Sequence, residues 1–234
     1  MKDEIDITFD FRSDTPKGRD PDVASPTLRR YHKFLWSKTL PGGAAFDLSD
    51  ARTDCYLHHC SALGEFFLAS DTVIPSFRKV PEIKSVIPEA EIEAFSKIGY
   101  TIGGMMVFPG NKIDGKMTIN GARGFHPRVR DRFDLTLECI RRHYVGEKSP
   151  LSEPLRRYSD FFKLFADFRG YVEFFLLHDL VINNGCEVKI SKPYDNFRNS
   201  PVPRDPNEYR AYRDEAVAFI NARNRRIRAA TTAA

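Results

Sequence analysis

Two glycines bracket an arginine near the middle of the chain, in the run TINGARGFHP. A strand is predicted to end at Asn120, so Gly121 and Gly124 give the next turn the freedom to raise Arg123 at its tip, with His126 close behind. A guanidinium has a planar fork of donors that fits phosphate or carboxylate. The free N–H groups at the start of the following helix also suit an anion. The run therefore predicts an exposed site for an anionic substrate.

The helix predicted over residues 127–144 carries charged side chains three and four residues apart, which places them on one face. This charged stripe consists of Arg130, Asp134, Glu138, Arg141 and Arg142. Its two acids are candidate catalytic residues beside Arg123 and His126, and its three arginines are candidate substrate-binding residues. The alternative is a solvated helix face, in which such pairs stabilise the helix by a few tenths of a kcal/mol each.

A second candidate feature is the histidine pair in the run YLHHCS. Neighbouring strand residues face opposite sides of a sheet, so His58 and His59 cannot easily hold one metal ion together. We expect His58 to contribute to substrate binding. The four cysteines form no Cys-x-x-Cys pair, so a zinc ribbon is not predicted, and no metal or cofactor is expected from these patterns.

The elements that must position these residues predict an α+β fold, with short antiparallel strands in the N-terminal half packed against a helical C-terminal half. Residues 1–26 are expected to form an irregular arm, 27–228 a single domain and 229–234 a frayed tail. The predicted strands are residues 54–60, 64–70, 100–110 and 116–120. The predicted helices are residues 27–37, 88–99, 127–144, 151–168, 171–181 and 207–227. We expect a buried core that includes Leu137, Phe162, Phe165, Phe174, Phe175 and Leu176.

The composition limits the classes of protein to which this chain can belong. The chain has 234 residues, of which 41% are hydrophobic and 29% charged, as in an ordinary globular protein. It has no apolar run long enough for a transmembrane helix, and its acidic first residues do not resemble a signal peptide, so we expect a cytoplasmic protein with reduced thiols. A net charge of +4 permits a nucleic acid as partner without requiring one.

Several runs together resemble a widespread bacterial family of unknown function. They are LRRYHKFLWSK, YTIGGMMVFPG, TINGARGF, DRFDLTLECIRRHY, FRGYVEFFLLHDLV and ARNRRI. The resemblance covers almost the whole chain, and it implies a bacterial, cytoplasmic setting. It implies no reaction, cofactor or catalytic residue.

A fainter resemblance links the runs YLHHCS, FFLASD and NEYRAY to ADP-ribosyltransferases. It implies NAD as a cofactor, held by His58 or His59. It also implies an aromatic ring against the nicotinamide, from Tyr100 or Phe108, and a glutamate at Glu208. The sequence departs from that pattern, because no glycine follows His58 and Glu208 is predicted to start a helix.

Three hypotheses result. The first is an enzyme of the toxin or defence type that acts on a nucleotide or nucleic acid, using two poised acid–base groups. The second is a non-catalytic protein whose basic face docks an acidic protein partner, and the third is the ADP-ribosyltransferase. Under the first hypothesis, an exposed Arg123 predicts that Arg123→Lys abolishes activity while leaving the melting temperature nearly unchanged.

Overall fold

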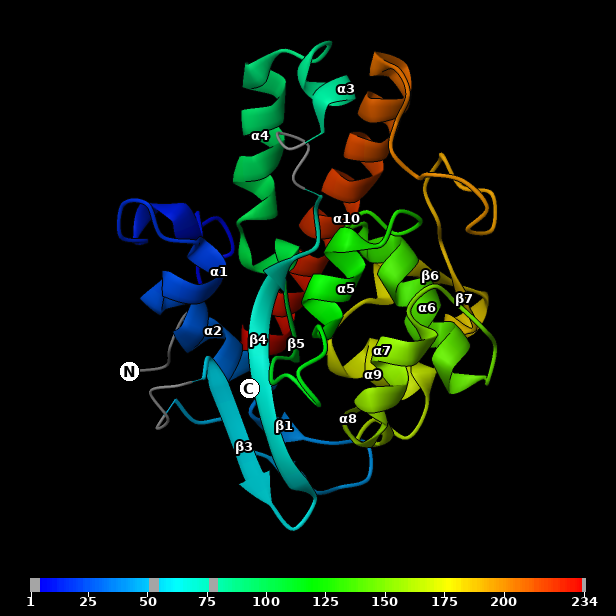
Figure 1. Ribbon diagram of the computed structural model, residues 1–234. Coiled ribbons are helices and arrows are strands. Elements are labelled where there is room, and N and C mark those ends of the chain that lie inside the picture. The colour runs from blue at the N-terminus through cyan, green and yellow to red at the C-terminus, as the bar shows by residue number, and fades with distance from the viewer. Residues whose placement is uncertain (1–4, 51–54, 76–79, 233–234) are drawn as a thin grey trace.

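The computed structural model of the protein describes residues 5–50, 55–75 and 80–232 (Figure 1). The main strands lie in the first half of the chain, and the longest helix, α10 (Pro206–Thr232), comes last, so the predicted α+β class is confirmed. Residues 1–4 of the predicted arm and 233–234 of the predicted tail lie outside the described residues. The described part of that tail is helical.

The main sheet is antiparallel, in the order β3 (Leu57–Ser61), β4 (Gly64–Thr72) and β5 (Met105–Pro109). Strands β3 and β4 form the predicted hairpin, in which His59 is paired with Phe66. Strand β5 is buried along its whole length and forms the centre of the molecule. Two small antiparallel sheets pair β1 (Lys38–Thr39) with β2 (Ala45–Phe46) and β6 (Val181–Ile182) with β7 (Glu187–Val188).

Two helices of the first half, α2 (Pro26–Trp36) and α4 (Glu89–Gly99), lie close to their predicted positions. Two short ones, α1 (Pro21–Ala24) and α3 (Pro81–Lys84), were not predicted. Helix α2 begins with proline, and the Ser25 hydroxyl accepts a hydrogen bond from the Leu28 N–H at 3.1 Å, a common start of a helix. The run IDITFDF, residues 5–11, alternates apolar and polar side chains in a way that predicts an edge strand, but it forms a turn and the start of a 3-10 helix.

The second half is helical as predicted, but its helices before α10 are shorter and more numerous, while α10 is longer than predicted. They are α5 (Ile119–Phe125), α6 (Phe133–Tyr144), α7 (Ser152–Arg157), α8 (Ser159–Lys163), α9 (Phe168–Phe174) and α10. Tyr158 separates α7 from α8 within the predicted helix 151–168. A left-handed residue, Leu176 with a φ of 56°, follows the end of α9. No helix in the described part of the chain is long and apolar enough to cross a bilayer.

Two predictions around Arg123 are wrong. Residues 116–120 do not form a return strand, because the Thr118 hydroxyl accepts from the Gly121 N–H at 3.4 Å and starts α5 there. The predicted helix 127–144 begins only at Phe133, because Arg130 and Asp131 have left-handed φ angles of 49° and 65°. Arg123 therefore lies within a helix, and Arg130 lies outside the helix that carries the rest of the stripe.

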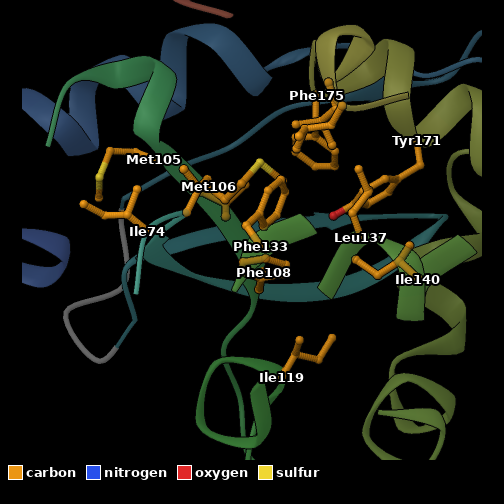
Figure 2. Close-up of a cluster of buried hydrophobic side chains, with 14 of the residues drawn as sticks. Ile74, Met105, Met106, Phe108, Ile119, Phe133, Leu137, Ile140, Tyr171 and Phe175 are labelled. Carbon is orange, nitrogen blue, oxygen red and sulfur yellow. The ribbon is translucent and has the colours of Figure 1, made fainter. Parts of the chain in front are cut away.

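The core lies around β5 and is rich in aromatic rings. Figure 2 shows Met106 and Phe108 of β5 close to Phe133 of α6, Met105 of β5 close to Ile74, and Phe175, just after α9, in the same cluster. The predicted core is confirmed for Leu137, Phe162, Phe165, Phe174 and Phe175, which are buried. Leu176 is only half-buried, because the left-handed turn at this residue carries its side chain toward the surface.

A fully buried arginine fixes α10 to this core. Arg223 Nη1 donates to the carbonyls of Gly103 at 3.0 Å and Met105 at 2.7 Å, and Nε donates to the Phe175 carbonyl at 3.1 Å. Its guanidinium lies 5.6 Å from the ring centroid of Trp36, which is also fully buried. Burial lowers the pKa of Arg223 to about 9.

Candidate functional site

Helix α5 covers an edge of β4 that none of the described strands occupies. The pairing of β3 with β4 ends at Leu68, and the carbonyls of Ser70 and Thr72 are left without a strand partner. Two side chains of α5 bond them instead. Asn120 Nδ2 donates to the Ser70 carbonyl and Arg123 Nη1 to the Thr72 carbonyl, both at 3.2 Å. This edge is where acids from several elements gather.

Arg123 is fully buried, so the prediction that it is exposed at a turn is wrong. Its Nη1 lies 2.6 Å from Asp71 Oδ2 and 2.9 Å from Asp131 Oδ1. Its Nη2 donates to the Asp131 carbonyl at 2.7 Å, and its Nε donates to the Thr136 hydroxyl at 3.1 Å. The guanidinium is drawn inward because these groups satisfy its donors, and it joins β4, α5 and α6.

Two acids near Arg123 have pKa values above their usual range. Burial raises the pKa of Asp71 to about 6, and this effect exceeds the opposing charge of Arg123. Burial also raises the pKa of Asp22 well above its usual value, and the negative charges of Asp71 and Asp20 act in the same direction. We call Arg123, Asp71, Asp131 and Asp22 the Arg123 centre.

Polar atoms around the Arg123 centre lack partners. Asp22 is 8% exposed, and its Oδ1 is buried without a hydrogen bond to any described residue. Asn120 Oδ1 is also buried without a hydrogen bond to any described residue. Buried polar atoms are nearly always hydrogen-bonded, and a catalytic role, a bound ion or a water is a common explanation of an exception. About 18% of the Asp71 side chain remains exposed.

A groove of about 360 Å³ adjoins the Arg123 centre through Thr72, the neighbour of Asp71 on β4. Its basic side comes from the loop 15–19, where Lys17 and Arg19 are exposed. Its opposite wall includes Tyr100. The pKa of Tyr100 is raised first by burial and then by the charges of Asp22, Asp20 and Asp71, so the electrostatic field of the centre extends into the groove.

The acids of the charged stripe are held by arginines rather than collected around Arg123. Asp134 is 2.5 Å from Arg132 Nη2. Glu138 is 2.8 Å from Arg141 Nε and 2.7 Å from Arg142 Nε. Burial opposes ionisation of Glu138, but the hydrogen bonds from these two arginines lower its pKa. The structure does not bring Asp134, Glu138 and Arg123 into a single pocket.

The three remaining candidates also lie apart. His126 caps the end of α5, where its Nδ1 accepts from the Arg128 N–H at 3.1 Å, and burial lowers its pKa. Arg130 is half-buried in the segment before α6. His58 lies 2.9 Å from Glu65, in the hairpin partner strand.

The ADP-ribosyltransferase arrangement would need His58 near Glu208. Glu208 instead lies 2.6 Å from Arg204 at the start of α10, and His58 has Glu65 as its partner. Nothing among the described contacts joins the two. The described residues also contain no group of three or more His, Cys, Asp or Glu side chains arranged to hold a metal ion.

A profile of a family described as "Family of unknown function (DUF6994)" matches residues 5–227. The chain belongs to this family. The sequence runs quoted above resemble a family of unknown function, and this resemblance is thereby confirmed over nearly the whole DUF6994 chain. No curated protein and no solved structure matches it.

Sequence reasoning missed most of the Arg123 centre of this DUF6994 protein. Asp71 ends an aromatic strand in the run LASDT, and Asp22 follows a proline in the run RDPD. A polar run at the end of an apolar strand was the available signal for Asp71. No local pattern connects Asp22 with Arg123, because their proximity depends on α1 and α5 meeting at β4.

Proposed function

We propose that the protein is an enzyme that acts on a nucleotide or nucleic acid by general acid–base chemistry at the Arg123 centre. The observation that carries the proposal is the pair of neighbouring acids whose pKa values are raised, Asp71 to about 6 and Asp22 well above its usual value. Groups with perturbed pKa values are concentrated at catalytic sites. Two acids with different protonation states at neutral pH can serve as base and acid in one reaction.

Each member has a role in this mechanism. Asp71 is largely ionised at neutral pH and accepts a proton from the attacking group. Asp22, whose carboxyl holds its proton more strongly than usual because it is buried, donates a proton to the leaving group. Arg123 does not bind the substrate in this scheme, because its donors are used internally; it positions Asp71 and keeps its pKa from rising further. Acid–base catalysis of this kind contributes about 10²–10⁴-fold in rate.

The groove supports a phosphate-bearing substrate. Lys17 and Arg19 are exposed on its basic side, and no ion pair with a described residue occupies either. Cationic side chains beside a cleft attract phosphates and raise the association rate. The substrate would lie along loop 15–19 and present its reacting group past Thr72 toward Asp71.

The test is turnover by the purified chain of ribonucleotides, NAD, short RNA and short DNA, with products separated by chromatography. We expect Asp71→Asn to lower kcat/KM for the substrate found by about 10²-fold or more. The matched control is Asp160→Asn, because Asp160 is 83% exposed and lies on α8. Equal activity of Asp71→Asn and the control would reject the role of Asp71.

Absence of turnover across the whole panel would favour the second hypothesis, a non-catalytic protein with an acidic partner. Turnover of NAD would instead favour the ADP-ribosyltransferase. The bacterial origin, the toxin or defence role and the cytoplasmic location stay predictions.

A further inference from the structure

Another cavity lies outside the Arg123 centre and its groove. It has a volume of about 720 Å³, within the range of small-ligand pockets. Its wall is the loop 192–204, which joins β7 to α10, and Arg128 and Glu208 complete it. We call this cavity the loop pocket.

The loop is held in one shape although it has no regular secondary structure. Arg132 Nη1 donates to the carbonyls of Pro193 at 2.7 Å and Pro201 at 3.1 Å, and its Nη2 donates to the Ser191 carbonyl at 2.7 Å. Arg132 is itself 1% exposed and paired with Asp134. Both ends of the loop are therefore attached to one buried guanidinium, so the pocket exists before any ligand arrives.

A second arginine holds the middle of the loop. Arg142 Nη2 donates to Asn196 Oδ1 at 2.5 Å, and its guanidinium lies 5.0 Å from the ring centroid of Phe197. Asn196 and Phe197 have left-handed φ angles of 59° and 62°. Such angles are costly for a bulky residue, and they persist mainly at ligand sites and switches, where surrounding contacts enforce them. Arg142 of the charged stripe thus helps to hold the wall of the loop pocket in place.

The lining combines free positive charge with aromatic rings. Lys192 is exposed and makes no hydrogen bond or ion pair with any described residue. Among the described residues the guanidinium of Arg128 bonds through Nη1, which donates to the Phe197 carbonyl at 2.5 Å, and its other donors make no hydrogen bond there. The pocket's two acids are already engaged: Glu208 with Arg204, and Asp195 with the N–H groups of the 195–199 turn.

We propose that the loop pocket binds a nucleotide, separately from the Arg123 centre. Lys192 and the free donors of Arg128 suit the phosphate. Tyr194, half-buried beside Phe197 with ring centroids 5.4 Å apart, offers a ring on which a planar base stacks. A free inorganic anion would use the cations alone and leave the aromatic wall empty.

Isothermal titration calorimetry of the full chain with AMP, GMP, CMP and UMP tests this proposal. Inorganic phosphate, which lacks the nucleoside, and adenosine, which lacks the phosphate, serve as half-ligands for comparison. We expect at least one mononucleotide to bind more tightly than either half-ligand. Lys192→Ala and Tyr194→Leu should each weaken binding by about tenfold or more, the loss of one charged hydrogen bond or one stacked base. Lys189→Ala is the matched control, because Lys189 is exposed nearby and lines a different cavity.

Two further variants separate this site from the catalytic one. Asp71→Asn and Lys17→Ala should leave unchanged the binding event that Lys192→Ala and Tyr194→Leu weaken, and Lys17→Ala should weaken only a separate event at the groove. Binding that is lost in Lys17→Ala and kept in Lys192→Ala would belong to the groove and overturn the proposal. So would the absence of binding at millimolar mononucleotide, or affinity for phosphate equal to that for the nucleotides. None of these outcomes depends on whether the chain turns a substrate over.

Discussion

The pH dependence of stability at Asp71 distinguishes a poised acid from an ordinary ion pair. Asp71 lies 2.6 Å from a guanidinium, a contact that by itself would lower its pKa and favour folding above about pH 4. Burial outweighs that contact and raises its pKa from 3.8 to about 6. The folded state then binds more protons than the unfolded state between these two values, so Asp71 stabilises the fold at low pH and loses this effect as the pH rises through 6.

The size of the effect is set by the difference between the two pKa values. At 1.36 kcal/mol for each unit, it is at most about 3 kcal/mol between pH 4 and pH 7. Asp71→Asn removes the titration and keeps the shape of the side chain. It also removes a charge that raises the pKa of Asp22, and this second effect has the same sign.

The measurement is the free energy of unfolding by urea, for the parent and Asp71→Asn, at several values between about pH 4.5 and pH 7.5. We expect the parent's stability relative to Asp71→Asn to fall as the pH rises. A relative stability that instead grows with pH would mean that the charge of Arg123 dominates. Asp71 would then be a simple counter-ion, and the base of the proposed reaction would be lost.

Other substitutions test the packing around the two sites. Phe174→Ala, measured by calorimetry, should lower the free energy of unfolding by about 3–5 kcal/mol. Phe125→Ala, at an 80% exposed position, is the control, and its free energy of unfolding should lie within about 0.5 kcal/mol of the parent's. Arg123→Lys should cost about 2–4 kcal/mol in urea unfolding, because an ammonium cannot replace the buried fork; an unchanged melting temperature would contradict the contacts described. Arg132→Lys should speed amide hydrogen exchange in residues 191–203 and leave β4 protected. An equal change of exchange rate in the loop and in β4 would show that the loop does not depend on this guanidinium.

Local patterns in the sequence were sufficient where neighbouring residues decide the structure. The β3–β4 hairpin and α2 and α4 follow from alternation, turn residues and caps, and they lie within a few residues of their predicted bounds. The α5 segment was misread, because two glycines were taken as a turn while the Thr118 cap started a helix. Glycine weakens a helix by only about 1 kcal/mol, which contacts of Arg123 with β4 can outweigh.

The candidate site was predictable only in part. Arg123 was singled out as an exposed residue of the site, but it is buried, and its acids come from positions 52 residues before and 8 residues after it. The long-range pairing of Asp71 with Arg123 depends on how α5 covers β4, which local spacing does not encode. The charged stripe was read as one helix face, and the left-handed residues Arg130 and Asp131 divide it.

The chain contains a single tryptophan, Trp36, and the position of its indole makes it a built-in optical reporter. The ring is enclosed by Phe174 and Phe175, with centroids 6.2 Å and 5.1 Å away, and by the cations of Arg223 and Lys38. Its fluorescence therefore reports on the place where α2, α9 and α10 meet. Emission from such a dry, fully buried indole is blue-shifted, and it moves to longer wavelength when water enters. A detachment of α10 would change this signal even while the main sheet stays intact.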